Sequence, residues 1–287
     1  MSTEQKYKID NLLQRMDDFP TLPTIYSSLM ELTSNPRSTV QDVANLISRD
    51  QAISVKLLKV ANSTVFGIQT KVDSISQAIF YLGYNEVKNI ALSLSIMDIF
   101  KKSNSRSDTF VVDLWKHSIA VGVITRLLGV RTGTKNLENY FISGIIHDIG
   151  KLFLYKFFKE NYINQLSDAF KSDIKASEIE RNVYGMNHDE IGSELAKMWK
   201  LPVSIRNAIK YHNNGLVGSE PDMLVGCIHL ANIISIMLKL GNPGYEASSQ
   251  PNFNIWKFIN LPFGTLKSIY NDIISAYKSN EKILSLK

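Results

Sequence analysis

Few features that mark secreted, membrane-spanning or nucleic-acid-binding proteins occur in this sequence. Its 287 residues include one cysteine, Cys227, which excludes an internal disulfide and fits a reducing compartment. The polar N-terminus lacks the apolar core of a signal peptide, and no apolar run approaches the roughly 20 residues that span a bilayer. The net charge of +5 is spread without a block of lysine and arginine, which argues against nucleic acid as a partner. We therefore expect a cytoplasmic protein without membrane insertion.

Histidine is also scarce, and it is unevenly placed. There are five histidines, and all of them lie between His117 and His229. The composition as a whole, with 44% hydrophobic and 21% charged residues, is that of an ordinary globular protein with a sizeable core. The placement of the histidines indicates that the middle of the chain carries chemistry that the two ends lack.

Helical periodicity runs through the sequence, and no stretch shows the alternation expected of strands. The polar, serine-rich segment 101–108 is the best candidate for a linker. The sequence thus predicts an all-α protein with a helical lobe at 1–100, a second helical lobe at 109–240, and a C-terminal loop and helical extension at 241–287.

A histidine–aspartate pair lies inside an apolar, helix-compatible run, GIIHDIGKL at residues 144–152. Neighbouring residues of a helix point about 100° apart, so an imidazole nitrogen of His147 and a carboxylate oxygen of Asp148 could straddle one ion. Gly150 leaves room for another helix to approach closely. The alternative is a pair on a helix surface with no ligand, and for a His-Asp dipeptide in isolation this alternative is favoured.

Other polar side chains are predicted to face inward from other helices. His117 falls on the apolar stripe of a helix over 111–128, and His188 lies in the first turn of a helix capped by Asn187. Helix bundles build metal sites from such inward side chains, although unrelated core histidines would give the same spacing. Both interpretations stay open. The members of the predicted cluster are His117, His147, Asp148, His188, His212 and, on a helix over 223–240, Asn232.

An ordered series of motifs between about Phe19 and Ser235 resembles the HDOD family, bacterial signalling domains related to the HD phosphohydrolases. The resemblance implies a two-lobed helical bundle, with an N-terminal helical lobe and a C-terminal HD-domain-like lobe. It also implies a regulatory output role, through contact with a signalling protein or a small ligand and usually without catalysis. The motifs are FPTLP (19–23), ISRD (47–50), KLLKVANS (56–63), FG (66–67), AI (78–79), LG (82–83), WKHS (115–118), HDIGK (147–151), GMNH (185–188) and WKLP (199–202).

Some relatives of this family, the HD-GYP proteins, are metal-dependent phosphodiesterases that act on cyclic di-GMP. The present chain matches their motif at six positions: His117, His147, Asp148, Lys151, His188 and His212. It departs at three places. Asn213 replaces a second adjacent histidine, Asn232 replaces the closing aspartate, and the Gly-Tyr-Pro signature is absent.

The departures weaken the case for catalysis, because Asn232 offers a neutral amide oxygen where a carboxylate would neutralise a cation. Four histidines and one aspartate could still hold a single divalent transition metal, which we expect to be iron, zinc, nickel or manganese. We therefore expect a signalling module with no catalytic residues. The alternative is a metal-dependent phosphohydrolase, for example one acting on cyclic di-GMP.

Overall fold

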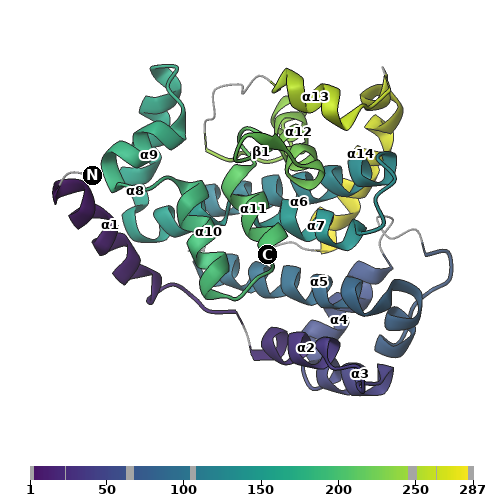
Figure 1. The fold of residues 1–287 in the computed structure, drawn as a ribbon. Coiled ribbons are helices and arrows are strands. Elements are labelled where there is room, and N and C mark those ends of the chain that lie inside the picture. The colour runs from purple at the N-terminus through teal and green to yellow at the C-terminus, as the bar shows by residue number, and fades with distance from the viewer. Residues whose placement is uncertain are drawn as a thin grey trace.

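The computed structural model describes residues 3–22, 24–62, 68–103, 108–244, 251–262 and 264–283. Within these ranges the regular structure is almost entirely helical, which confirms the all-α prediction (Figure 1). A two-residue antiparallel ladder of β1 (Leu216–Val217) and β2 (Glu220–Pro221) is the exception in this part of the chain. None of the helices described here is long and apolar enough to cross a membrane.

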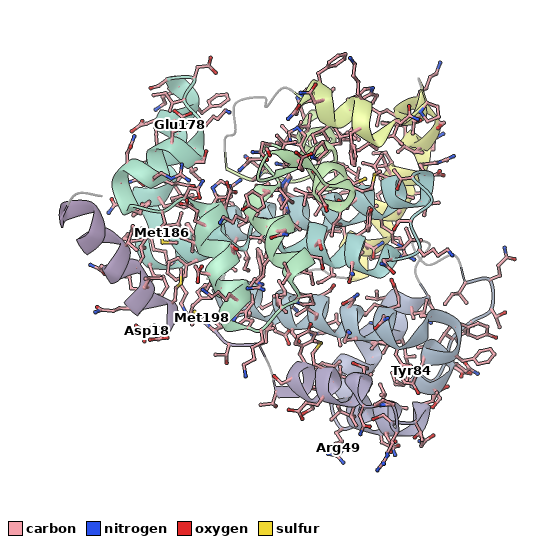
Figure 2. The ribbon with its side chains drawn as sticks, in the orientation of Figure 1. Asp18, Arg49, Tyr84, Glu178, Met186 and Met198 are labelled. Atoms are coloured by element: carbon pink, nitrogen blue, oxygen red, sulfur yellow. The ribbon has the colours of Figure 1, made fainter. Side chains whose placement is uncertain are left out.

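Three short helices pack on one long one in the N-terminal part of the chain. These are α2 (Thr24–Ser34), α3 (Val40–Ser48) and α4 (Gln51–Ala61), which contact α5 (Ile75–Ser103). The long helix is kinked at Gly83, whose φ of 81° is readily adopted by glycine. Arg49 and Tyr84 mark this part of the molecule in Figure 2.

Asn62 ties the end of α4 to the segment that leads into α5. Its amide nitrogen donates to the carbonyls of Leu58 and Val72, and its side-chain oxygen accepts from the backbone N–H of Val72, all within 2.9 Å. These hydrogen bonds fix the backbone between α4 and α5, so the role of Asn62 is structural. The neighbouring motif residues 63 and 66–67, and Pro23 of the first motif, lie outside the described residues.

The first helix, α1 (Thr3–Met16), does not join α2–α4 but lies against α9 (Ala176–Tyr184) (Figure 1). Phe19 follows it and is buried, with its ring centroid 5.4 Å from that of Phe153 and 6.3 Å from that of Trp199. The start of the chain thus packs on the histidine-bearing part. The lobe boundaries stay a prediction, and residues 104–107 of the expected linker lie outside the described ranges.

Six helices form the central layer that carries the histidines. α6 packs against α7 and α12, and α10 packs against α8 and α11. Two glycines let α6 and α7 approach closely, because a Cβ on Gly144 would lie 2.6 Å from the Cα of Gly122. Their bounds are α6 Thr109–Arg131, α7 Leu137–Ile146, α8 Ile149–Lys171, α10 His188–Met198, α11 Val203–Tyr211 and α12 Met223–Met237.

Two further helices complete the described part of the C-terminal extension. α13 (Phe253–Ile259) packs on α12, and α14 (Thr265–Ile283) contacts both α6 and α4. The last helix therefore touches the central layer and the N-terminal helices at once. Buried Ile255 and Ile269 belong to the same core as the rest of the molecule.

Gly144→Ala should destabilise the fold by about 1–3 kcal/mol, because the new methyl group has only the backbone of α6 to displace. Asn139→Ala, a half-buried position on the same helix, is the control and should change the free energy of unfolding by less than about 0.5 kcal/mol. Urea unfolding followed by circular dichroism measures both. Equal effects of the two substitutions would show that the α6–α7 contact is not tightly constrained.

Candidate metal centre

The His147–Asp148 pair lies at a turn between two helices. We expected one helix across 144–152, but α7 ends at Ile146 and α8 begins at Ile149, with Asp148 at φ −103° and ψ 18°. The turn redirects the chain and brings Gly150 onto the start of α10. A Cβ on Gly150 would lie 2.0 Å from the carbonyl oxygen of His188, so the close approach predicted for this glycine is confirmed.

The carboxylate of Asp148 is the centre of the cluster. Its Oδ2 atom accepts a hydrogen bond from the Lys151 ammonium at 2.9 Å and lies 3.4 Å from His147 Nε2 and 3.9 Å from His117 Nε2. Its Oδ1 atom lies 3.4 Å from His212 Nε2 and 3.7 Å from His188 Nε2. The two oxygens therefore face two different pairs of imidazoles.

Hydrogen bonds on the far side of three rings fix which nitrogen faces Asp148. His147 Nδ1 lies 2.8 Å from the Gly144 carbonyl, and His212 Nδ1 lies 2.8 Å from the Ile209 carbonyl. A carbonyl only accepts, so in the neutral form of each ring the proton resides on Nδ1 and Nε2 keeps its lone pair. His117 Nδ1 has Ser235 Oγ at 3.1 Å, and that hydroxyl donates to the Leu240 carbonyl, which assigns the same tautomer.

His188 is held between two carboxylates. Glu180 Oε2 accepts from His188 Nδ1 at 2.5 Å and from the His188 backbone N–H at 2.9 Å, and its other oxygen accepts from the Tyr162 hydroxyl. On the opposite side of the ring, Asp189 Oδ1 lies 3.1 Å from Nε2. Both carboxylates are buried, so this position attracts a positive charge.

The charges in the cluster are mutually dependent. Burial alone would raise the pKa of Asp148, but His147 and Lys151 lower it well below its usual value. Burial, and then His147, lower the pKa of His117 well below the usual value for histidine. Burial would also lower the pKa of His188, but Glu180 and Asp189 raise it well above that value. His117 thus favours the neutral imidazole, whereas His188 favours the charged form beside the carboxylates of Glu180 and Asp189.

Several buried polar atoms of this cluster have no hydrogen-bond partner, which tests whether its residues fit a metal. Among the described residues these atoms include three imidazole nitrogens, a carboxylate oxygen and an amide oxygen: His117 Nε2, His147 Nε2, His212 Nε2, Asp148 Oδ1 and Asn232 Oδ1. Unpartnered buried atoms are costly unless something else binds them. Imidazole nitrogen and carboxylate oxygen are suited to a divalent transition metal, so the donor set fits one.

Among the described residues, two groups could each hold an ion, and they share Asp148. One is His117, His147 and Asp148, and the other is Asp148, His188 and His212, with the ligand atoms of each group within 4.8 Å of one another. The structure therefore brings five of the predicted residues together. Asn232 is also buried. Its interaction with the His117 side chain raises the pKa of His117, an effect smaller than the lowering by burial. The assignment of all six as ligands stays a prediction.

Sequence reasoning missed two residues of the site and left one histidine unassigned. Glu180 lies on α9, a helix that we did not anticipate, and Asp189 was passed over although it directly follows His188. His229 instead faces the backbone: its Nδ1 lies 3.1 Å from the His212 carbonyl, and its Nε2 accepts from the N–H of Asn252. His229 therefore stabilises the backbone next to His212 and lies outside the cluster.

The all-helical fold and the buried His–Asp pair at a helix junction, surrounded by further histidines, agree with the resemblance to the HDOD domain. The profile of the HDOD domain matches residues 19–215. The chain belongs to the HDOD domain family, as the motifs predicted.

The chain aligns with less than half the length of each of two curated relatives. An uncharacterized protein of Treponema pallidum (strain Nichols) is 26% identical over 238 residues, which is 82% of this chain and 45% of that protein. The uncharacterized protein YuxH of Bacillus subtilis (strain 168) is 29% identical over 127 residues, or 44% of this chain and 30% of that protein.

Solved structures share the fold over nearly the whole chain. An HDOD domain protein of unknown function from Geobacter sulfurreducens has a TM-score of 0.77 at 23% identity, covering 97% of this chain and 98% of its own. A Shewanella amazonensis SB2B protein named provisionally as a phosphohydrolase has a TM-score of 0.74 at 24% identity, with coverage of 96% and 98%. A Marinobacter aquaeolei VT8 protein named provisionally for signal transduction has a TM-score of 0.75 at 17% identity, with coverage of 98% and 65%.

Asp148→Ala should reduce the free energy of unfolding by about 3–5 kcal/mol, because it removes the carboxylate that faces the fully buried Lys151 ammonium. Asp148→Ala combined with Lys151→Met should recover most of the loss. Asp168→Ala is a matched control, because Asp168 and Lys171 are also three residues apart but more than 70% exposed, and it should cost less than about 0.5 kcal/mol. Urea unfolding compares the four proteins. A double variant no more stable than Asp148→Ala would contradict the charge argument.

Proposed function

We propose that this protein is a bacterial signal-transduction module that acts through contact with a protein or a small ligand, without hydrolysing phosphodiesters. Membership of the HDOD family supports a regulatory role, and one relative of the same fold is named for signal transduction. In this proposal the His–Asp cluster organises the core of the domain, and any ion it binds holds the helices together. The lobes at 1–100 and 109–240 and the extension at 241–287 are part of the same proposal.

The burial of the cluster is the observation that carries the proposal. The side chains of His117, His147, Asp148 and His212 are 0% exposed, and that of His188 is 2% exposed. A phosphodiesterase must bring a phosphate oxygen and a water molecule to its metal ions. Ligand side chains buried to this extent give a bound metal little access to solvent or substrate in this conformation.

The turn that follows α12 contributes to the seal. Gly241, at φ 77°, lies against the backbone of α6, so that a Cβ there would be 2.2 Å from the backbone nitrogen of His117. The next residue, Asn242, donates its N–H to the Asp113 carbonyl at 3.1 Å. The loop is therefore fastened over the same helix turn that carries His117, and opening this side requires the loss of a backbone hydrogen bond.

The charge at the cluster supports the same proposal. The Lys151 ammonium already occupies Oδ2 of Asp148 at 2.9 Å, and Asn232 contributes an amide oxygen where the enzymes of the superfamily carry a carboxylate. An ion on this side would therefore be poorly neutralised and a weak activator of water.

A metal-dependent phosphohydrolase, for example one acting on cyclic di-GMP, is the second candidate. It is favoured by the two groups of metal-binding residues that share Asp148, since two neighbouring ions are a recurrent arrangement for phosphodiester cleavage. A relative with the same fold is also named as a phosphohydrolase. This candidate requires the cluster to open to solvent, which makes it directly testable.

We expect the unaltered protein, supplied with Mn²⁺ or Fe²⁺, to hydrolyse cyclic di-GMP no faster than a metal-only blank, as measured by chromatography of the products. Asn232→Asp restores the missing carboxylate and should raise the bound metal measured by elemental analysis. Asn139→Asp, which adds the same charge at a half-buried position near the start of α7 and outside the cluster, is the matched control. Metal-dependent hydrolysis by the unaltered protein that disappears in Asp148→Ala would establish the second candidate instead.

A further inference from the structure

The two oxygens of Asp148 face surroundings of different charge. On the Oδ2 side, the nearest group is the Lys151 ammonium at 2.9 Å, followed by the imidazoles of His147 and His117. On the Oδ1 side lie His188 and His212, and Oδ1 itself has no hydrogen-bond partner. The ammonium hydrogen-bonds Oδ2 directly, so it repels a cation more strongly on the first side than on the second.

A second carboxylate belongs to the Oδ1 side. Asp189 Oδ1 lies 3.1 Å from His188 Nε2 and 3.5 Å from His212 Nε2. Asp148 Oδ1 lies 3.7 Å and 3.4 Å from the same two nitrogens. The four atoms thus form a closed ring with sides of 3.1–3.7 Å. Ligands bound about 2.0–2.2 Å from a transition metal lie at comparable distances from their neighbours, about 3–3.5 Å.

Two asparagines hold the Asp189 carboxylate in place. The amide nitrogen of Asn213 donates to both oxygens, at 2.9 and 3.0 Å, and also lies 3.4 Å from His188 Nε2. The amide nitrogen of Asn187, the N-cap of α10, donates to Oδ2 at 3.1 Å. These donors satisfy the outer lone pairs of the carboxylate, so Oδ1 remains directed at the two imidazoles.

Glu180 completes the arrangement from behind His188. By accepting a hydrogen bond from Nδ1–H, it leaves Nε2 as the nitrogen that faces the ring of four atoms. Carboxylates placed in this way behind a histidine ligand orient the imidazole and increase its basicity. In the same manner the Ile209 carbonyl orients His212. Both nitrogen donors of the ring are therefore preset.

We propose that Asp189, rather than Asn232, supplies the second carboxylate of the metal centre. The first divalent transition metal ion binds between Asp148, His188, His212 and Asp189, where two carboxylates and two imidazoles surround it. The His117–His147 side is the weaker of the two, because the Lys151 ammonium binds the Asp148 oxygen on that side and the described residues place no second carboxylate there. This inference holds whether or not the protein hydrolyses a phosphodiester.

The test measures Zn²⁺ affinity by competition with a chromophoric chelator, on protein stripped of metal and checked by circular dichroism. Asp189→Asn keeps the size of the side chain and should weaken binding of the first Zn²⁺ by more than about 100-fold. Asn213→Ala loosens the carboxylate and should weaken it by about 10-fold. His117→Gln and Asn232→Ala are the controls on the other side of Asp148, and neither should change the first affinity by more than about threefold, a change well short of the loss of a ligand.

Three results would contradict the proposal. These are an Asp189→Asn affinity within threefold of the unaltered protein, a loss in His117→Gln as large as that in Asp189→Asn, and an unaltered protein that binds neither Zn²⁺ nor Co²⁺. The last result would make the His188–Asp189 contact a structural ion pair. If Asp189→Asn does not fold, the visible absorption of bound Co²⁺ replaces it: Asp189→Glu should shift the bands, and an unchanged spectrum would exclude Asp189 as a ligand.

Discussion

The central constraint of this structure is a carboxylate buried at a helix junction. An isolated ionised aspartate in a protein interior is strongly unfavourable, so the surroundings of Asp148 must supply positive charge or hydrogen-bond donors. Lys151, one helical turn later, supplies the nearest charge at 2.9 Å. Four imidazoles from different parts of the chain surround the remaining oxygen surface. The packing of α6, α8, α10 and α11 brings these groups to one point.

The helix ends deliver most of these groups. His147 and His212 are the C-caps of α7 and α11, and each ring donates to the carbonyl three residues earlier. The same short-range bond thus orients both rings and satisfies a carbonyl at a helix end that would otherwise lack a partner. His188 occupies the first position of α10, where its backbone N–H is free to bind Glu180. The helix termini therefore position the side chains of the site.

The sequence was sufficient to predict the helical fold, because helical periodicity reports directly which face of each helix is buried. It placed four histidines on inward faces but left open whether they belong to one site. Asn187 was also identified as an N-cap, and its side chain accepts from the N–H of Glu190. The sequence was not sufficient to place the break at His147–Asp148, because the apolar spacing of Ile145, Ile149 and Leu152 is the same for one helix or two. The packing of α1 on α9 depends on long-range contacts that no local pattern encodes.

The missed residues show how substitutions in this site depend on one another. Asn213 was considered only as the loss of a histidine, and Asn232 only as the loss of an aspartate. In the folded chain the Asn213 amide binds both oxygens of Asp189, a contact that an imidazole could not make in the same bidentate manner. Among the described residues, the second carboxylate of the site, Asp189, thus lies on the side of Asp148 opposite Lys151. A histidine at position 213 without a change at 189 would leave that carboxylate short of a donor, so the two positions must be considered together.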